Sequence, residues 1–410
     1  MRVLFIAWDG PQVHYLETLF VPIFAALRNH GVEFHILQFT WANRKQRETI
    51  FDVCAQHGIP YVAASVIRNP LRMGACLTVL NGRRLIKKLA RQWSIDVLMP
   101  RSTLPALMCL TSLERSGLPL VFDADGLPLD ERVDFAGESV NSWVQKFLRR
   151  VEAYAVCQAD TVLTRTSIAV DILSERAGEL QDRAKFHVVG NGRDSNAFTS
   201  MSIDCRAQAK HELGLHAYAP LLVFAGSLGE QYCLPEMFKL IGAIKTRCPD
   251  AGLLILTGDT YVACNALLSQ PELQQAVVVK SVKPEAVPQY LACADLGLAL
   301  RRPAYSMQAV APIKIGEYLL SGIPVVATKG IGDTAALDDR VAFLVERMSD
   351  EELYAAAQWF VDSVLPDRAL FALRCRELGC EAYSLDASVQ AYVSAFKQMA
   401  DSPNRGLSDL

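Results

Sequence analysis

Short runs of Val, Ile and Leu recur along this chain, and stretches with helical periodicity separate them. The runs hardly alternate with polar residues, which is the pattern of strands buried on both faces of a parallel sheet. In the first half the expected strands are 3–7, 33–39, 96–99, 120–123, 161–164 and 187–189. Between the first two of them, apolar residues spaced three and four apart predict a helix over 16–27.

A second series of strands begins after a polar stretch, 193–210, which follows Asn191-Gly192 and has no strong period. Its expected members are 221–225, 253–256, 277–279, 295–300 and 325–327. The chain has 410 residues, a length that suits about two domains. Strand–helix alternation in both halves therefore predicts an α/β protein with two doubly wound parallel sheets.

Composition and cysteine spacing exclude several classes. The net charge of -3 does not suit a chain built to coat nucleic acid. The 11 cysteines include no Cys-x-x-Cys pair and the 7 histidines are dispersed, so we expect reduced thiols, no metal site and a cytoplasmic protein. The apolar part of the N-terminus is too short for a signal peptide, and no window is long enough for a spanning helix.

Open α/β sheets bind ligands at the carboxyl ends of their strands, so the loops there are the places to look for chemistry. Gly10, after the first strand, is a candidate donor contact because it allows a ligand to approach the backbone, although a tight turn explains it equally well. Asp123 and Asp125 follow a later strand and are candidates to bind sugar hydroxyls, accept a proton or hold a cation. The alternative for these two carboxylates is a solvated turn.

Two loops of the second half suggest a phosphorylated ligand. Gly226 and Ser227 expose amides close to a helix that begins near Pro235, an arrangement that favours a phosphate. Lys314 falls in the first turn of a helix that Pro312 can start, where the helix dipole does not help a cation. A bound polyphosphate would explain that lysine, and Glu317, one turn further on, suits two ribose hydroxyls. The alternative is a surface Lys–Glu pair.

The segment Pro312-x-Lys314-x-x-Glu317-Tyr318-Leu319-x-x-Gly322-x-Pro324-Val325-Val326-Ala327 resembles the donor-site signature of glycosyltransferase family four, the retaining enzymes of the GT-B fold. Three other landmarks fall in the family's order. They are Val188–Asp194 with Phe198, Phe224–Gly229 and Ala294–Leu298.

The resemblance implies a GT-B fold, in which two Rossmann-like domains face a cleft. Residues 1–195 with a C-terminal helix in 386–410 would form the acceptor-binding domain, and 196–385 would bind the nucleotide-sugar donor. Val389, Tyr392, Val393 and Phe396 give that last helix one apolar stripe. The family further implies retention of the anomeric configuration, no metal and no cofactor besides the nucleotide sugar, Glu317 on the ribose, and phosphates on the amides near Gly226.

Two departures from the family pattern change the expected site. The family often has an Arg in the first phosphate loop and a Lys a few residues on, whereas Ser227 and Leu228 follow Gly226 here. We therefore expect the diphosphate at the amides of 226–228 and at Arg301, Arg302 and Lys314. The family's first glutamate is replaced by Ala309, which leaves the group that reads the sugar unassigned.

The resemblance implies a hexosyl transfer from a UDP- or GDP-sugar to an acceptor hydroxyl, in surface polysaccharide or glycolipid assembly. Arg101, Asp123 and Asp125 are the candidate catalytic contacts to acceptor or sugar. Two alternatives stay open: a GT-B sugar-nucleotide epimerase, and a catalytically inactive GT-B binding subunit. A nicotinamide dehydrogenase would need a glycine fingerprint that is missing here.

A helical face with four cations, Arg84, Lys87, Lys88 and Arg91, suggests one more partner. Each cation near an anionic lipid surface contributes about 1 kcal/mol, which suits a lipid-linked acceptor and a peripheral position at the inner face of a membrane. The alternative is an ordinary solvated face.

Overall fold

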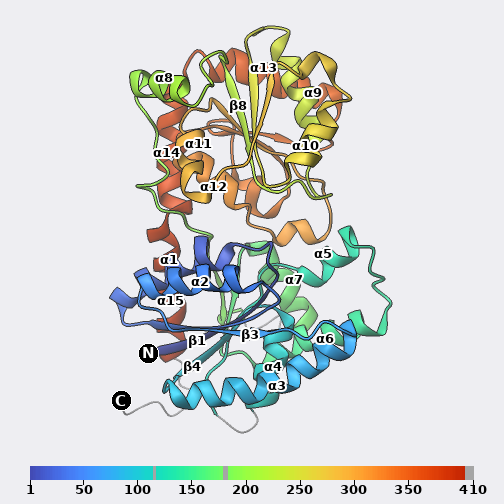
Figure 1. Ribbon diagram of the computed structural model, residues 1–410, viewed down its shortest axis with the longest axis vertical. Helices are drawn as coiled ribbons and strands as arrows, with labels where there is room; N and C mark the ends of the chain where they lie inside the picture. Colours follow the sequence, from blue (N-terminus) through green and yellow to red (C-terminus); the bar gives the residue numbers. More distant parts are fainter. Residues whose placement is uncertain (114–116, 179–182, 402–410) are drawn as a thin grey trace. The chain divides into compact units, whose positions relative to one another are not determined.

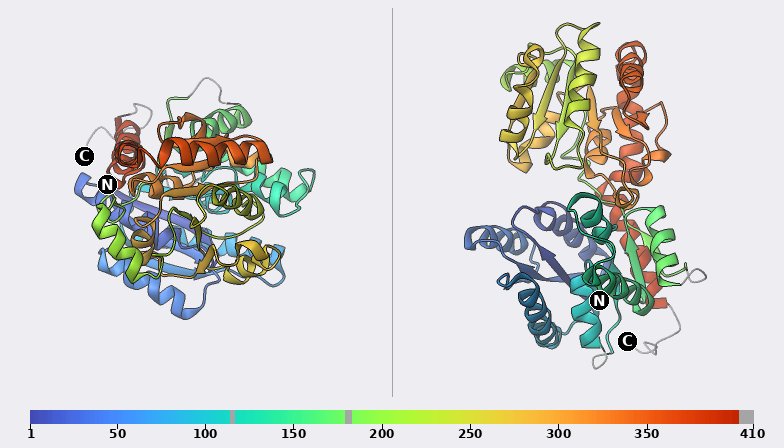
Figure 2. Two further views of the ribbon diagram at one scale, coloured as in Figure 1. Left: turned by 90° about the horizontal axis from the view of Figure 1, so that it is seen from above. Right: turned by 90° about the vertical axis from the view of Figure 1, so that its right-hand side faces the viewer.

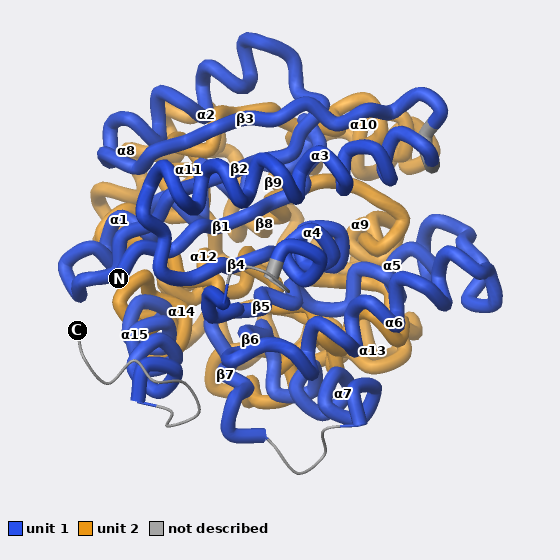
Figure 3. Tube along the Cα trace, turned by 90° about the horizontal axis from the view of Figure 1, so that it is seen from below, with its two compact units in different colours: residues 1–190, 388–410 blue, residues 191–387 orange. Residues whose placement is uncertain are grey.

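The computed structural model describes residues 1–113, 117–178 and 183–401 (Figure 1). Contacts divide the chain into two compact units, which Figure 3 shows in different colours. Unit 1 is 1–190 with the residues from Ser388 on, and unit 2 is Asn191–Ala387. The chain thus passes between the units at 190/191 and 387/388, where the sequence suggested 195/196 and 385/386.

The strands of unit 1 are all parallel. β3-β2-β1-β4 form one sheet and β5-β6-β7 another. Isolated parallel bridges from Leu98 to Leu120 and from Arg101 to Asp123 place β5 beside β4. The strands are β1 Arg2–Asp9, β2 Glu33–Thr40, β3 Tyr61–Ser65, β4 Val97–Pro100, β5 Val121–Asp123, β6 Thr161–Thr164 and β7 Phe186–Val188.

Helices lie on both sides of these strands (Figure 1). Phe24 of α1 stacks on Phe34 of β2, and Phe34 meets Phe396 of α15 edge to face, so the C-terminal helix packs on unit 1. Successive contacts join α3, α4, α6 and α7 into another layer. The helices and helical turns are η1 Leu16–Phe20, α1 Val21–Leu27, η2 Arg28–His30, α2 Arg44–Gln56, α3 Leu71–Gln92, α4 Thr103–Leu113, α5 Pro128–Phe135, α6 Trp143–Gln158, α7 Ser167–Ala177 and α15 Leu385–Asp401.

Unit 2 contains one parallel sheet of order β10-β9-β8-β11-β12-β13. Fully buried Val, Ile and Leu fill its central strands, as the unalternating runs predicted. The strands are β8 Leu221–Ala225, β9 Gly252–Leu256, β10 Val277–Lys280, β11 Leu296–Ala299, β12 Val325–Thr328 and β13 Ala342–Val345.

The two faces of this sheet have separate apolar cores, and helices cover both (Figure 2). One core includes residues of α9, α10 and α13, and the other includes residues of α8, α11, α12 and α14. The helices and helical turns are α8 Ile203–Glu212, α9 Leu234–Lys245, α10 Thr260–Leu267, η3 Pro271–Leu273, η4 Pro284–Ala286, α11 Val287–Leu291, η5 Ser306–Ala309, α12 Ile313–Leu320, η6 Gly332–Ala336, α13 Asp350–Trp359, η7 Phe360–Val364 and α14 Arg368–Tyr383.

The prediction of two doubly wound parallel sheets is confirmed. The polar stretch 193–210, which separates the two predicted series of strands, does not contain the boundary between the units. The stretch lies inside unit 2 and contains most of α8. Arg206 of α8 is buried, donates to the Cys293 carbonyl and pairs with Asp295 at 2.7 Å, so α8 belongs to the unit's core. Among the described helices, none is both long enough and apolar enough to cross a bilayer.

Candidate functional site

Lys314 is the most unusual side chain of unit 2. It stands in the first turn of α12, behind the N-cap residue Pro312, and is 7% exposed. Its Nζ lies 3.9 Å from the centre of the Phe224 ring and 4.1 Å from that of Tyr232. Within the described part of the chain, this Nζ has no hydrogen-bond partner. Burial, reinforced by Arg301, lowers the Lys314 pKa well below its usual value.

Arg301 brings a second cation to the same aromatic ring. It follows the end of β11, its Nη2 donates to the Tyr232 hydroxyl at 2.8 Å, and its guanidinium carbon lies 4.7 Å from the centre of that ring. Its Nε is buried, and no acceptor for it exists among the described residues. Arg302, next in the chain, is exposed. Two cations therefore share Tyr232, and neither forms an ion pair with a carboxylate in the described structure.

The loop after β8 comes within reach of Lys314. Gly226 has φ +140°, and a Cβ at this position would lie 3.1 Å from Lys314 Nζ. The amide of Gly226 already donates to the Leu256 carbonyl, and that of Leu228 donates to Asp259 Oδ2, each at 2.9 Å. Of the three amides predicted to meet phosphates, only that of Ser227, an exposed residue, has no acceptor in the described structure.

Glu317 has a partner that the sequence did not suggest. Its Oε1 lies 2.9 Å from Arg193 Nε, and the two side chains are 12% and 15% exposed. Burial raises the pKa of Glu317, and Arg193 opposes that shift. Arg193 itself is held by its backbone, which accepts from the amide of Leu385 and donates to the carbonyl of Tyr383. The alternative of a surface Lys314–Glu317 pair is wrong, because Lys314 is buried and Glu317 pairs with Arg193.

In unit 1, the strand ends bring Arg101, Asp123 and Arg165 together. Arg101 follows β4, Asp123 ends β5 and Arg165 follows β6. Asp123 is fully buried and accepts from Arg165 at 2.7 and 2.9 Å and from Arg101 at 3.3 Å. It also accepts from the amide of Asp125. Asp123 was predicted to contact substrate, but its oxygens are fully occupied and no solvent reaches it, so it holds the two arginines in place instead.

Asp125 is the accessible member of this group. It has φ +54° and its side chain is 34% exposed, while it forms an ion pair with Arg101 Nη2. Burial raises the Asp125 pKa to about 6, against the opposing effect of Arg101. Arg101 is only 6% exposed and packs over the Phe20 ring, so it acts on any ligand mainly through Asp125.

Gly10 packs closely against Trp41 of its own unit. A Cβ at Gly10 would lie 2.6 Å from Cζ2 of Trp41, so the absence of a side chain makes room for that indole. This contact with Trp41 explains the glycine without a ligand, by packing that the sequence did not suggest. Asp9, one residue earlier, has a pKa raised by burial, which Arg101 partly offsets.

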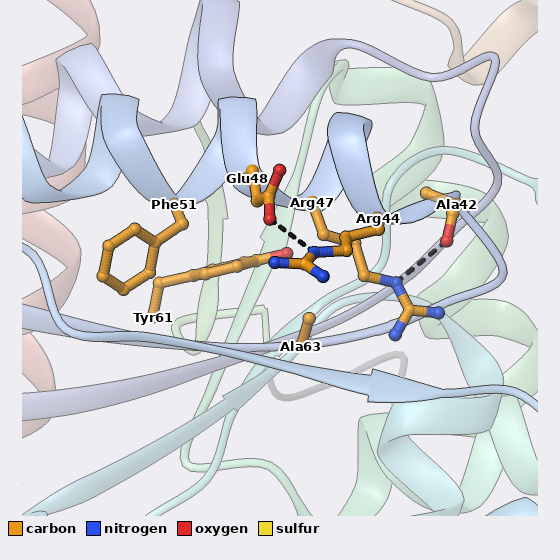
Figure 4. A pocket seen from close by; sticks show the side chains of 7 residues that line it. All are labelled: Ala42, Arg44, Arg47, Glu48, Phe51, Tyr61 and Ala63. Atoms are coloured by element: carbon orange, nitrogen blue, oxygen red, sulfur yellow. Dashed lines mark hydrogen bonds and ion pairs between the residues drawn. The ribbon is translucent and has the colours of Figure 1, made fainter.

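A hollow of about 450 Å³ lies elsewhere in unit 1, between α2 and β3 (Figure 4). Phe51 and Tyr61 form one part of its lining, and Arg44 pairs with Glu48 beside them. None of the residues predicted from the sequence lines this hollow.

The four predicted lipid-docking cations lie on α3, where Arg84, Lys88 and Arg91 are exposed and Lys87 is half-buried. Among the residues that the structure describes, no three His, Cys, Asp or Glu side chains gather as a metal site would require.

Three residues of these clusters were missed as site residues from the sequence. Arg165 directly follows a predicted strand, which is the signal that found the Asp123 loop. Arg193 lies within a segment that was singled out, although nothing in its spacing points to Glu317. Tyr232 gave no signal, because its role depends on the bridge between its backbone and that of Arg301.

Comparison with known protein families identifies the family of this chain. Residues 17–192 match the glycosyl transferase 4-like domain, and residues 219–363 match the glycosyl transferases group 1 domain. This chain belongs to the family-four-like glycosyltransferases of the GT-B fold. A comparison with curated protein sequences gives no match.

Solved structures of this glycosyltransferase fold resemble nearly the whole chain. HepE from Anabaena, in complex with UDP, is 16% identical over 97% of this chain and 100% of its own, with a TM-score of 0.69. Sucrose-phosphate synthase from Thermosynechococcus elongatus is 14% identical over 97% and 98%, with a TM-score of 0.68. A Listeria monocytogenes protein assigned as a UDP-N-acetylglucosamine 2-epimerase is 13% identical over 99% and 98%, with a TM-score of 0.61.

Proposed function

We propose that this glycosyltransferase binds a UDP- or GDP-sugar in unit 2 and transfers the hexose, with retention, to an acceptor hydroxyl. The observation that carries the proposal is the pair of cations around Tyr232. Lys314 Nζ and Arg301 Nε are buried without hydrogen-bond partners in the described structure. Buried cations without partners are costly, and a diphosphate would satisfy both.

The same geometry supports departure of the nucleotide diphosphate. As the bond between the sugar C1 and the diphosphate oxygen breaks, negative charge grows on the phosphates. Lys314, Arg301 and the free amide of Ser227 are fixed donors in a partly desolvated site, so they stabilise that charge without reorganising. The acceptor oxygen bonds to C1 and its proton passes to the leaving phosphate, so the reaction needs neither a protein base nor a metal.

Glu317 is the proposed ribose contact, with Arg193 as the residue that positions it. An ionised carboxylate accepts hydrogen bonds from two vicinal hydroxyls, whereas a protonated carboxyl group has less acceptor capacity. Because burial raises the Glu317 pKa, Arg193 is needed to keep the carboxylate ionised. Arg193 is therefore part of the donor site through Glu317.

The structural relatives are compatible with this donor class. HepE was solved with UDP, with UDP and glucose, and with UDP-glucose. The likeness to the Listeria protein keeps the epimerase as a second candidate, and an inactive GT-B binding subunit is a third. Product identity separates them, because an epimerase changes the sugar without any acceptor and an inactive subunit turns over nothing.

Unit 1 is the proposed acceptor half. Asp125 is its exposed carboxylate at the strand ends and suits a hydroxyl of a glycan or a lipid-linked glycan. The proposal includes an anionic membrane surface as a further partner, through Arg84, Lys87, Lys88 and Arg91, and a role in surface polysaccharide or glycolipid assembly.

The test is a calorimetric and thermal-shift titration with UDP, GDP, ADP, CMP and NAD, in EDTA. A ligand that binds the native state raises its melting temperature. We expect stabilisation by UDP or GDP, and its loss in Lys314→Met. Stabilisation by NAD alone, or by no nucleotide, would contradict the proposed donor site.

A further inference from the structure

The exposed charged residues of helices α3, α4 and α6 in unit 1 are basic along most of their length. From Arg83 on, α3 has basic residues and no acidic ones, and α4 has no charged residue. The one acidic residue of α6 is Glu152, whose side chain is 3% exposed and pairs with Arg176. The basic residues of α3 from Arg83 on and of α6 are Arg83, Arg84, Lys87, Lys88, Arg91, Lys146, Arg149 and Arg150, of which Arg149 pairs with Asp130. These helices are thus locally basic in a chain whose net charge is -3.

The outward stripe of α3 changes character along its length. Its first half exposes Met73, Leu77 and Leu80, with exposed fractions of 64%, 47% and 52%. The same stripe, at helical spacing, continues with Arg84, Lys88 and Arg91. The opposite face, with Gly82, Ile86 and Leu89, is buried in the unit. An apolar segment and a cationic segment therefore lie end to end on one exposed face.

A second stripe, on α6, mixes the two kinds of side chain. Trp143, Phe147 and Tyr154 are 70%, 46% and 52% exposed and occur at helical spacing, and Lys146 and Arg150 stand among them. Both α3 and α6 contact α4, which lies between them and is itself largely buried (Figure 3). α3 and α6 therefore each present one exposed stripe, on either side of α4.

We propose that these two stripes together form a docking surface for an anionic lipid bilayer, with the apolar side chains inserted among the headgroups. Trp and Tyr favour the membrane interface, and Lys and Arg beside them meet lipid phosphates while their stems stay apolar. Positive charge without exposed acidic residues favours an anionic partner, and exposed Trp, Phe, Leu and Met favour one that can also accept apolar groups.

This inference deepens the membrane partner proposed above and rests on it, but it adds α6 and an inserted apolar part to the four cations of α3. It does not depend on the donor site, because all of its residues lie in unit 1. Electrostatic adsorption alone would vanish at high salt. A surface with inserted apolar side chains keeps part of its binding there.

The experiment is flotation of the full chain with phosphatidylcholine vesicles and with vesicles containing phosphatidylglycerol, at low and physiological salt. We expect binding to the anionic vesicles, a blue shift of Trp143 emission and its quenching by brominated lipid. The triple variant Arg84→Ser, Lys88→Ser, Arg91→Ser should weaken partitioning about 100-fold, since each cation near the surface contributes about 1 kcal/mol. Trp143→Ser with Phe147→Ser should remove the salt-resistant part.

Matched variants in unit 2 give the controls. Lys239→Ser, Arg340→Ser, Arg347→Ser removes the same charge, and Tyr261→Ser with Leu268→Ser removes side chains that are 82% and 70% exposed. Neither control should change flotation. Absence of binding at low salt, an equal loss in the controls, or equal binding of wild type and the Trp143/Phe147 variant would overturn the two-part surface. Nucleotide-induced stabilisation of the same variants reports on the donor site separately.

Discussion

Replacing Lys314 by Met should stabilise the ligand-free protein and abolish its response to nucleotide. Lys314 is 7% exposed, and its amine has no hydrogen-bond partner within the described structure. Met keeps the length and apolar volume of the stem but removes the buried amine. Such a change trades an unfavourable buried charge for ordinary packing against Phe224 and Tyr232.

The size of the effect follows from the environment of the amine. Neutralising an ordinary lysine at pH 7 costs about 4.8 kcal/mol, from about 1.4 kcal/mol for each pH unit below its usual pKa, and this is a ceiling. The two ring contacts return about 0.5–1 kcal/mol each if the amine stays charged. Replacing buried charged groups by apolar side chains of similar volume often stabilises a protein by about 1–4 kcal/mol. We therefore expect a net gain of about 2 kcal/mol, below that ceiling, or roughly 4–8 °C in the melting temperature of a unit of this size.

The pH dependence has a definite sign. Because burial lowers the Lys314 pKa in the folded state, the unfolded chain binds this proton more tightly. The free energy of unfolding of the wild type therefore rises as the pH rises toward the ordinary lysine pKa. The stability advantage of Lys314→Met over the wild type should narrow from pH 6 to pH 9.

Thermal melts with and without UDP or GDP measure both effects. Lys239→Met, at an exposed lysine that pairs with Asp350, is the control and should leave stability and the nucleotide response unchanged. A destabilised Lys314→Met variant that still responds to nucleotide would refute the reasoning, because the amine would then contribute to folding and not to donor binding.

The remaining predictions concern four other positions. Glu317→Ala should raise the donor KM more than it lowers kcat. An unchanged donor KM would contradict the proposed contact between Glu317 and the ribose. Arg193→Gln should also raise the donor KM and should shift the pH profile, because the Glu317 pKa is then no longer held down; an Arg193→Lys variant should recover part of the loss. Asp125→Asn should remove an activity rise near pH 6. Since the Asp125 pKa is raised to about 6 in the folded state, the wild type should also lose stability relative to this variant as the pH rises from about 4 to about 6. Gly226→Ala should cost about 1–3 kcal/mol in unfolding experiments, because φ +140° suits only glycine, and it should weaken nucleotide binding through the crowded Lys314 amine.

The sequence predicted every described strand except two, to within two residues at each end. Strands buried on both faces are continuous apolar runs, so β6 and β8 were predicted at their observed bounds. The strands β3 and β13 were missed, and both lie at sheet edges. Their side chains are largely half-buried, and β3 contains the small residues Ala63 and Ala64, so neither shows the apolar run that marks a central strand.

The candidate site was predictable as a set of loops but not as a set of partners. Lys314 and Glu317 were found because their motif is local. The pairing of Glu317 with Arg193 joins segments more than a hundred residues apart. Asp123 is shared by Arg101 and Arg165, which lie 22 and 42 residues from it in the chain. The sequence also does not show which loop amides are already hydrogen-bonded. The amides of Gly226 and Leu228 donate to the Leu256 carbonyl and to Asp259.

The balance of charge gives the two clusters different chemistry. In unit 1, Arg101 and Arg165 face Asp123, Asp125 and the nearby Asp9, so the cluster has no positive excess to attract an anion. A neutral hydroxyl compound fits it better than a phosphate does. In unit 2, the buried amine of Lys314 and Nε of Arg301 have no partner in the described structure, so an anion relieves a cost that the folded protein already bears. Inorganic pyrophosphate should therefore stabilise the wild type and Asp125→Asn alike and leave Lys314→Met unaffected. Stabilisation that increases in Asp125→Asn, where Arg101 loses its exposed carboxylate partner, and that persists in Lys314→Met would place the anion in unit 1 and reverse the assignment of donor and acceptor halves.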